Sequence, residues 1–417
     1  MPATTDALSA APSSGERLAR NRDFLVVLVG QGISSLGDAV TNTALPILVL
    51  ALSGSGFAMG VVGVMSTLPD LIVGLPAGAF ADRWDRRRMM FAADVGRAVL
   101  TALVPLSVWL GGPTLAIVIV VAFPLNVLRV LWLAAWTAAV PGLVGRAQVP
   151  RGNAIFEAVF TLGWIVGPAV AGVLAGTIGP GPTIAIDGVS FAVSAVSVLF
   201  IRRSLRPAAR PEPTHLLEDV REGVRFLAHQ RTLRSVVALW TTTSVISAGL
   251  TASLIFYITR DRAEGTAAVG LVLSAFAVGS FAGSVAAARW SPRAVGPVML
   301  AGVGGMGVAM VASVGTPLPV IVVAALLAGV LNALVAVAYL SLRTQLSPDA
   351  LLGRIGATAR TLSVGLMPIG SLAAGIALDA VGGGLTLAVM GAGMVVAALA
   401  FGLMPDLRGA RIRVEAA

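Results

Sequence analysis

Residues 74–88 read GLPAGAFADRWDRRR, and this stretch decides which fold we predict. An apolar run ends at Asp82, and a cluster of arginines interrupted by Asp85 follows. Gly74 and Gly78 lie four residues apart, so an apolar helix would carry a smooth strip for close packing against a neighbouring helix in a bilayer. Dense positive charge after an apolar helix places that end on the cytoplasmic side. The stretch therefore predicts a transmembrane helix that ends in a cytoplasmic loop.

The composition indicates a polytopic membrane protein. Of the 417 residues, 57% are hydrophobic and 12% are charged, and the mean hydropathy is +0.91. Soluble domains carry about 25% charged residues. The absence of cysteine excludes disulfides, thiol catalysis and thiolate metal sites. The two histidines, His215 and His229, lie in a polar central segment, so we predict no metal or other cofactor.

The distribution of positive charge predicts orientation in a membrane. All 29 basic residues are arginines. Successive loops between the apolar segments lie on alternate sides of the membrane. Only Arg260 and Arg262 fall in the loops on one side, and three arginines lie within the apolar segments. The remaining 24 fall in the loops on the other side and in the tails. By the positive-inside rule both termini are cytoplasmic, and the net charge of +9 indicates contact with anionic lipid rather than with nucleic acid. The first residues lack an apolar segment, so no cleaved signal peptide is expected.

Twelve apolar segments have about the twenty residues that a transmembrane helix needs. They are residues 24–50, 57–81, 89–110, 115–139, 154–177, 183–201, 235–259, 267–288, 294–314, 317–340, 355–378 and 385–404. We predict a cytoplasmic tail (1–23), a first six-helix bundle (24–201), a linker (202–234), a second six-helix bundle (235–404) and a second cytoplasmic tail (405–417). Within the linker, apolar residues at helical spacing predict an amphipathic helix on the inner membrane surface that either binds a partner or merely connects the bundles.

The two halves show an internal repeat. Gly74 and Gly78 of the second span correspond to Gly279 and Gly283 of the eighth span. Residues of the fifth and eleventh spans correspond at a constant offset, as Pro168 and Pro368 show. Duplication explains this pattern better than coincidence does.

Residues 74–88 resemble the loop between the second and third helices of the major facilitator superfamily. The matching residues are Gly78, Asp82, Arg83, Arg86 and Arg87. Asp85 stands where most members carry a second glycine, so the turn there must be made differently. Further pieces resemble a branch of drug and siderophore exporters that includes macrolide and enterobactin efflux proteins. These pieces are ISSLGDAV (33–40), ADVGRAVL (93–100), GPAVAG (167–172) and EGVRFL (222–227).

The resemblance implies an all-α membrane protein with twelve transmembrane helices in two pseudo-symmetric bundles. In this fold a substrate site lies near the midplane between the bundles, and access alternates as one bundle rocks against the other. The resemblance also implies a conformational latch at the loop after the second span. Its expected members are Gly78, Asp82, Arg83, Arg86, Arg87, Asp94 and Arg97. Asp94 and Arg97, three residues apart, can also neutralise each other on one helix face.

Ionisable residues inside a membrane are expensive, and each is a candidate functional group. At 1.5 Å per residue, Asp38 lies about 21 Å from the cytoplasmic face and Arg129 about 15 Å from it. An arginine side chain spans the difference of about 6 Å, so the two residues could pair if their helices face one another. Many exporters of the family that couple to protons carry an acid on the first helix and an arginine on the fourth. The resemblance therefore implies that Asp38 carries a proton and that Arg129 modulates it.

Alternatives to these roles remain open. The Asp38 and Arg129 pair could be a static ion pair that only holds two helices together. Asp70 could assist Asp38 or attract a cationic substrate, or it could simply pair with Arg129 or be solvated in the cavity. Arg360 could meet substrate anions, but we favour its reaching the cytoplasmic interface by snorkelling.

The fifth span resembles the antiporter signature of the family at Gly163, Gly167, Pro168 and Gly172, which favours export. Close packing by small residues explains the same spacing without any transport direction. The predicted substrate-binding residues are mostly aromatic or amide side chains within spans. They are Gln31, Asn42, Trp132, Trp136, Trp164, Trp240, Asn332 and Tyr339. Aromatic walls with few charges suit a hydrophobic or amphipathic molecule, although Trp and Tyr also serve as interfacial anchors.

We therefore predict a secondary transporter of a bacterial plasma membrane that exports a hydrophobic or amphipathic small molecule in exchange for protons. We expect the chain to be monomeric, to contact lipid and to have no enzymatic activity, because no nucleotide-binding loop, metal cluster or nucleophile and base pair is visible. The alternatives are a metabolite importer or uniporter of the same fold, or a membrane sensor that does not transport.

Overall fold

The computed structural model describes residues 18–206, 216–289, 294–348 and 351–411. Parts of both predicted tails and of the linker lie outside the described residues. Nearly all of the described chain is helical. The helices are α1 (Arg22–Ser53), α2 (Gly56–Arg83), α3 (Arg86–Trp109), α4 (Thr114–Val144), α5 (Val149–Thr177), α6 (Pro180–Leu199), α7 (Leu216–His229), α8 (Arg231–Ser247), α9 (Leu250–Phe256), α10 (Thr266–Arg289), α11 (Val295–Ser313), α12 (Leu318–Leu346), α13 (Leu352–Gly365), α14 (Met367–Gly402) and the short α15 (Pro405–Arg408).

Local signals in the sequence set the ends of these helices. The side chain of Asn21 accepts a hydrogen bond from the Phe24 amide at the start of α1, and Ser55 caps α2 in the same way through Ala58. Gly54, with φ of 61°, ends α1 in the left-handed conformation that glycine adopts most easily. The turn between α1 and α2 is therefore short and well defined.

The described residues contain eleven helical stretches that are long and apolar enough to cross a membrane. The last stretch, Leu352–Gly402, has 51 residues and would be about 77 Å long if it were straight, whereas the apolar core of a bilayer is about 30 Å thick. At Gly382 the backbone leaves helical geometry with φ of 79°, which divides this stretch into two crossings. The fold is thus consistent with the twelve crossings that we predicted.

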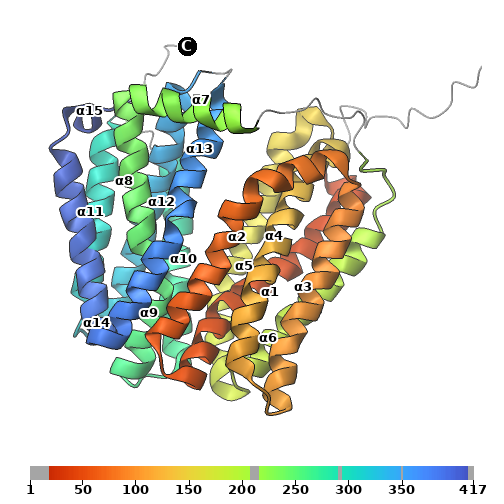
Figure 1. Ribbon diagram of the computed structural model, residues 1–417, viewed down its shortest axis with the longest axis horizontal. Helices are drawn as coiled ribbons and strands as arrows, with labels where there is room; N and C mark the ends of the chain where they lie inside the picture. Colours follow the sequence, from red (N-terminus) through yellow and green to blue (C-terminus); the bar gives the residue numbers. More distant parts are fainter. Residues whose placement is uncertain (1–17, 207–215, 290–293, 349–350, 412–417) are drawn as a thin grey trace, which may run out of the picture.

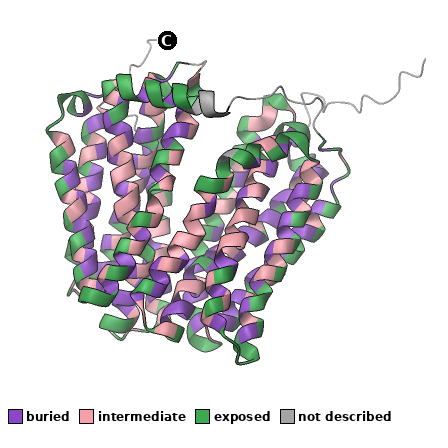
Figure 2. Ribbon diagram, in the orientation of Figure 1, coloured by how far each residue is buried: buried purple, intermediate pink, exposed green. Residues whose placement is uncertain are grey.

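The outer surface of the helices is apolar, as expected for a protein that faces lipid. Val120, Val396 and Leu399 are examples of large apolar side chains that are exposed. Buried residues concentrate where helices of the same group meet, as Figure 2 shows. The exposed apolar side chains are too numerous and too widely spread for an ordinary soluble surface.

The transmembrane helices form two groups, α1–α6 and α8–α14, that meet mainly through α2 against α14 and α5 against α10. Figure 1 shows the groups close together near the turn between α1 and α2, and further apart at the opposite end, where α7 lies. We call these the closed end and the linker end. At the closed end, a Cβ atom added at Gly60 would lie 2.8 Å from the Ser371 carbonyl oxygen, so only glycine permits this contact between the groups.

The two glycine pairs of the internal repeat differ in their surroundings. A Cβ atom at Gly279 would lie 2.0 Å from the Leu326 carbonyl oxygen, so α10 packs closely against α12 through its glycines. Gly74 and Gly78 have no atom within 4 Å of such a Cβ, so the close packing predicted for them is absent in this conformation. The reason is their position, because they lie on α2 towards the linker end, where the groups diverge.

The predicted amphipathic helix is present as α7, but it packs against the second group. A Cβ atom at Gly223 would lie 2.3 Å from Thr358 Oγ1 of α13, and Glu222 forms an ion pair with Arg354 of the same helix. The described part of the linker, α7, is thereby attached to α13.

Candidate functional site

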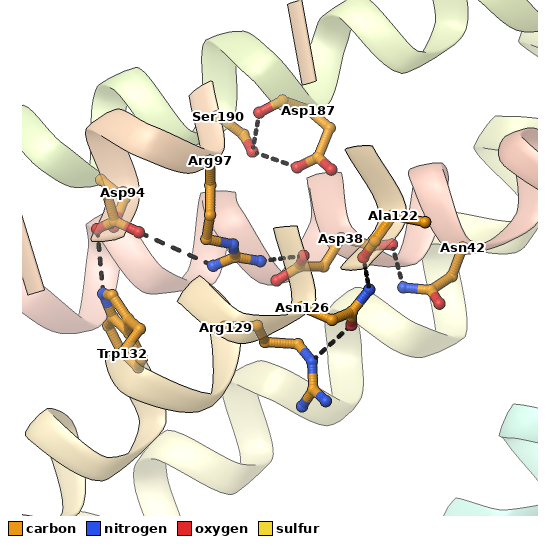
Figure 3. A network of polar contacts seen from close by, with 11 residues as sticks. Asp38, Asn42, Asp94, Arg97, Ala122, Asn126, Arg129, Trp132, Asp187 and Ser190 are labelled. Atoms are coloured by element: carbon orange, nitrogen blue, oxygen red, sulfur yellow. Dashed lines mark hydrogen bonds and ion pairs between the residues drawn. The ribbon is translucent and has the colours of Figure 1, made fainter. Parts of the chain in front are cut away.

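A network of ionisable side chains, most of them buried, lies inside the first group of helices (Figure 3). Asp38 of α1 forms an ion pair with Arg97 of α3, and Arg97 Nη1 lies 3.8 Å from Asp94 Oδ1 on its own helix. The side chain of Asp38 is 17% exposed, that of Arg97 is 2% exposed and that of Asp94 is fully buried. Asp94 Oδ2 also accepts hydrogen bonds from Trp132 Nε1 at 3.1 Å and from Ser194 Oγ at 2.7 Å.

The structure corrects the partner that we expected for Asp38. Asp38 pairs with Arg97, whereas Arg129 pairs with Asp70. The depths estimated for Asp38 and Arg129 differed by no more than the length of an arginine side chain, but depth does not determine the direction in which a side chain leaves its helix. The predicted ion pair between Asp94 and Arg97 is present, and Arg97 extends it to α1.

Asp187 of α6 was missed by the sequence analysis. It is 1% exposed, and its Oδ1 atom accepts a hydrogen bond from Ser190 Oγ at 2.9 Å. A Cβ atom at Gly37 would lie 2.5 Å from the same Oδ1 atom, so glycine next to Asp38 allows α1 to approach Asp187. The signal was available, because Asp187 is an acid within the predicted span 183–201, and the same criterion had selected Asp38.

A second ionic cluster joins the two groups. Asp70 of α2 accepts from Arg129 Nη2 at 2.5 Å, and Arg360 Nη2 of α13 lies 3.4 Å from the other oxygen of Asp70. Arg129 Nε also donates to Asn126 at 3.0 Å. Arg360 therefore meets an acid of the other group, which corrects the interfacial position that we favoured. Its side chain is 62% exposed, so solvent screening keeps this pair weak.

The loop between α2 and α3 is held by Asp85 rather than by a second glycine. Asp85 Oδ1 accepts from the amides of Arg87 and Arg88 at 3.0 and 3.3 Å, which caps α3. Arg86 Nε donates to the Ala81 carbonyl at 3.2 Å. Arg87 Nε donates to the Val198 carbonyl of α6, also at 3.2 Å, and so ties the loop to its own group.

Two predicted latch residues in the last turn of α2 are unengaged. Asp82 and Arg83 are exposed, and neither side chain has a hydrogen bond or ion pair within the described part of the chain. This conformation therefore leaves Asp82 available for another partner.

The glycines predicted on the fifth span lie at two different interfaces. Cβ atoms at Gly163 and Gly167 would lie 2.9 Å from Ser35 Oγ and 2.4 Å from Ala39 Cβ, which shows close packing of α5 on α1. A Cβ atom at Gly172 would lie 2.9 Å from Gly270 Cα, which joins α5 to α10 across the two groups. Pro168 lies at the same crossing, where its carbonyl oxygen faces Gly270.

The predicted substrate-binding residues are distributed over several places. Trp132 and Trp136 are buried within the first group, where the Trp136 ring stacks on Phe156 with centroids 4.4 Å apart. Trp240 and Tyr339 stack in the second group with centroids 4.6 Å apart. The remaining members are Gln31, which is buried, Asn42, which donates to the Asp38 carbonyl, Trp164, which is partly exposed, and Asn332, which is half-buried. Their binding role stays a prediction.

The family model described as "Transmembrane secretion effector", a model of major facilitator transporters, matches residues 17–410. The chain belongs to the major facilitator superfamily. The chain is 31% identical to the multidrug efflux pump Tap of Mycolicibacterium fortuitum, over 86% of this transporter and 90% of that protein. It is 24% identical to macrolide efflux protein A of Streptococcus pyogenes over 52% and 54% of the two chains. A crystal structure of a variant of the nucleoside transporter NupG superimposes with a TM-score of 0.78, at 12% identity, over 92% of this chain and 100% of that one.

Membership of this superfamily confirms the predicted fold class and makes the protein a transporter of small molecules rather than an enzyme. The membrane-spanning helices, together with relatives that are bacterial efflux proteins, support a multi-pass protein of the plasma membrane. The structure gives the positions and contacts of the predicted site residues. Their roles in transport are proposals.

Two charged side chains, Asp379 and Arg260, hold the two groups of the transporter together at its closed end. Asp379 of α14 accepts from Ser55 Oγ at 2.7 Å and from the amides of Gly56 and Phe57 at 2.5 and 2.9 Å. An acid of the second group thus caps the first turn of α2 in the first group, where the helix dipole favours negative charge. Arg260 donates to the Gly54 carbonyl in the same turn. We call these contacts the closed-end clasp.

Replacement of Asp379 by alanine is expected to favour opening of the closed end. Loss of a helix cap costs about 1 kcal/mol, which shifts an equilibrium about fivefold. Ser371 of α14 is buried where this helix contacts Gly60 and Gly63 of α2. Because the chain has no cysteine, a single Ser371→Cys substitution would report on opening at this contact. We expect faster labelling of this cysteine by an impermeant maleimide added on the closed-end side.

Asp261→Ala is the matched control. Asp261 accepts from the Gly384 amide at 2.9 Å, but both residues belong to the second group. Equal labelling rates in the Asp379→Ala and Asp261→Ala backgrounds would show that the clasp does not hold the two groups together.

Proposed function

We propose that this transporter exports a hydrophobic or amphipathic small molecule, such as a drug, an antibiotic or a siderophore-like compound, in exchange for protons. Support for export of drugs comes from the relatives, which are named as multidrug and macrolide efflux proteins. Support for proton coupling comes from the buried ion pair of Asp38 and Arg97. This pair is the observation on which the proposal mainly rests.

The proposed orientation places the linker end in the cytoplasm. Four arginines of the loop after α2 and those of α7 lie at this end, and the positive-inside rule assigns it to the cytoplasm. In this orientation the two groups are in contact at the outer end and diverge towards the cytoplasm. A substrate would enter from the cytoplasm or the inner leaflet in this conformation.

A proton at Asp38 would change the charge of the whole network. Burial disfavours an ionised carboxylate, whereas the guanidinium of Arg97 favours it, so a small change in their separation can release or take up a proton. Moving one charge across 100 mV of membrane potential is worth about 2.3 kcal/mol, and a tenfold change in proton affinity is worth about 1.4 kcal/mol. These energies are comparable, so proton entry could drive substrate export through this pair.

Alternating access would use the groups within residues 24–201 and 235–404 as rocking units. The face of α2 that contacts α14 through Gly60 and Gly63 continues, at spacings of three and four residues, to Gly74 and Gly78. Closing the linker end would bring this open strip against α13. Asp82, which is unengaged in this conformation, would then be free to form the latch.

A test uses inverted membrane vesicles and the fluorescent cation ethidium as the probe. We expect Asp38→Asn to abolish proton-driven accumulation of ethidium. Asparagine keeps the size of the side chain, but its amide neither binds nor releases a proton. Asp406→Asn, an exposed acid of α15, is the control and should transport normally. Accumulation that persists in the Asp38→Asn variant, or that is insensitive to a protonophore, would refute proton antiport through Asp38.

A further inference from the structure

We infer that Asp187 of α6 is a second proton-carrying group, which shares the guanidinium of Arg97 with Asp38. The inference rests on the proton coupling proposed above and deepens it. It assigns a function to a buried acid that no part of the proposed mechanism uses so far.

The surroundings of Asp187 do not satisfy an ionised carboxylate. The residue is 1% exposed, and Ser190 Oγ donates to its Oδ1 atom at 2.9 Å. Its Oδ2 atom is buried without a hydrogen-bond partner within the described residues. A charged oxygen left unpaired out of water is costly, whereas a neutral carboxylic acid tolerates this position far better.

The packing of α1 on α6 brings the two acids together. Gly37, the neighbour of Asp38, is pressed against α6 so closely that a Cβ atom there would lie 2.2 Å from Ser190 Oγ. Phe191, one helical turn after Asp187 on α6, has its ring centroid 3.8 Å from the guanidinium of Arg97, so the same face of α6 borders both Gly37 and Arg97. In Figure 3 the carboxyl group of Asp187 is turned towards the side of the network where Asp38 meets Arg97.

Acids outnumber bases in this part of the membrane domain. The charged side chains within the spans of the helices packed against α6 are Asp38 of α1, Asp94 and Arg97 of α3, and Glu157 of α5, which is exposed. Three carboxyl groups, of which Asp94 and Asp187 are buried and Asp38 is 17% exposed, therefore stand against one guanidinium in this part of the protein. If all three were ionised, two negative charges would remain uncompensated out of water, so the network is suited to hold protons.

One guanidinium and two flanking carboxyl groups form an element with two states. When Arg97 neutralises Asp38, as it does in this structure, Asp187 is the acid that holds a proton. When Arg97 moves to Asp187, that acid releases its proton and Asp38 takes one up. Each exchange of the guanidinium therefore moves one proton from one helix to the other, with no change in the charge of the network.

Chemical labelling of the wild-type protein tests the protonation of Asp187 directly. Dicyclohexylcarbodiimide modifies protonated carboxyl groups in apolar surroundings. We expect mass spectrometry of the labelled full chain at neutral pH to find the adduct on Asp187, and we expect Asp187→Asn to remove it. An unmodified Asp187 alongside a labelled Asp38 would overturn the inference.

Transport by variants tests the function of the same group. We expect Asp187→Asn to lower ethidium accumulation to the level measured with a protonophore, while ethidium movement down its own gradient persists. Compared with Asp187→Asn, Asp187→Glu should restore part of the proton-driven accumulation, and the pH profile of this accumulation should be shifted from that of the wild type. A purely structural role of Asp187 would not shift the pH profile. Full accumulation with an unchanged pH profile in Asp187→Asn would overturn the inference.

The two proposals fail in different ways. If Asp38→Asn retains proton-driven accumulation, the proposed antiport itself is refuted. If Asp38→Asn loses it while Asp187→Asn and the Asp406→Asn control both keep it, only the role of Asp187 is refuted.

Discussion

Arg97→Ala is expected to destabilise the folded transporter by about 3–5 kcal/mol, which is the usual result of removing one partner from a buried ion pair. The substitution leaves the carboxyl groups of Asp38, Asp94 and Asp187 without a nearby cation. It also removes the stacking of the guanidinium over the Phe191 ring, 3.8 Å from its centroid. Thermal unfolding of the purified protein in detergent would measure the loss, and export of ethidium should be lost with it.

Compensation by a second substitution separates charge from packing. Asp38→Asn in the Arg97→Ala background removes one of the orphaned charges and should restore part of the lost stability. Arg97→Lys keeps the positive charge and should be milder than Arg97→Ala, while Arg408→Ala, at an exposed position, should have little effect. A wild-type unfolding temperature for Arg97→Ala would show that the buried ion pairs do not stabilise the folded transporter.

Gly279→Ala is expected to destabilise the protein by about 1–3 kcal/mol or more, since overpacking against rigid atoms has this cost. The added Cβ atom would lie 2.0 Å from the Leu326 carbonyl oxygen, and backbone cannot move aside as a flexible side chain can. Thermal unfolding in detergent measures this effect as well.

Gly74→Ala is the matched control, because it alters the corresponding residue of the internal repeat. A Cβ atom at Gly74 meets nothing within 4 Å, and alanine is about 1 kcal/mol more favourable than glycine inside a helix. We therefore expect Gly74→Ala to leave this conformation as stable as before, or more so. Equal destabilisation by Gly74→Ala and Gly279→Ala would show that the asymmetry of the two repeats is not real.

Which parts of the site were predictable depends on the kind of interaction. The ion pair of Asp94 and Arg97 followed from their spacing on one helix, because residues three apart share a face. The pairing of Asp38 did not follow, because it depends on how α1 is rotated about its own axis within the first group. Packing of Gly37 against α6 sets part of this rotation, and no pattern within a single helix encodes it.

The sequence by itself determined that this chain is a helical membrane transporter. Apolar segments of about twenty residues have no other stable form in lipid than a helix, and the basic loop after Asp82 identifies the family. Local caps such as Asn21 and Ser55 set where helices begin, because they act within one turn.

Only the tertiary structure decided which charges meet and which end is closed. Asp70 joins Arg129 of its own group and Arg360 of the other group. The first contact depends on how α2 and α4 pack, and the second depends on the relative placement of the two groups. The repeated glycines make the same point, because identical residues are packed in α10 and open in α2. The physical reason is that helix formation is local, whereas ion pairing and close packing depend on how whole helices are positioned in three dimensions.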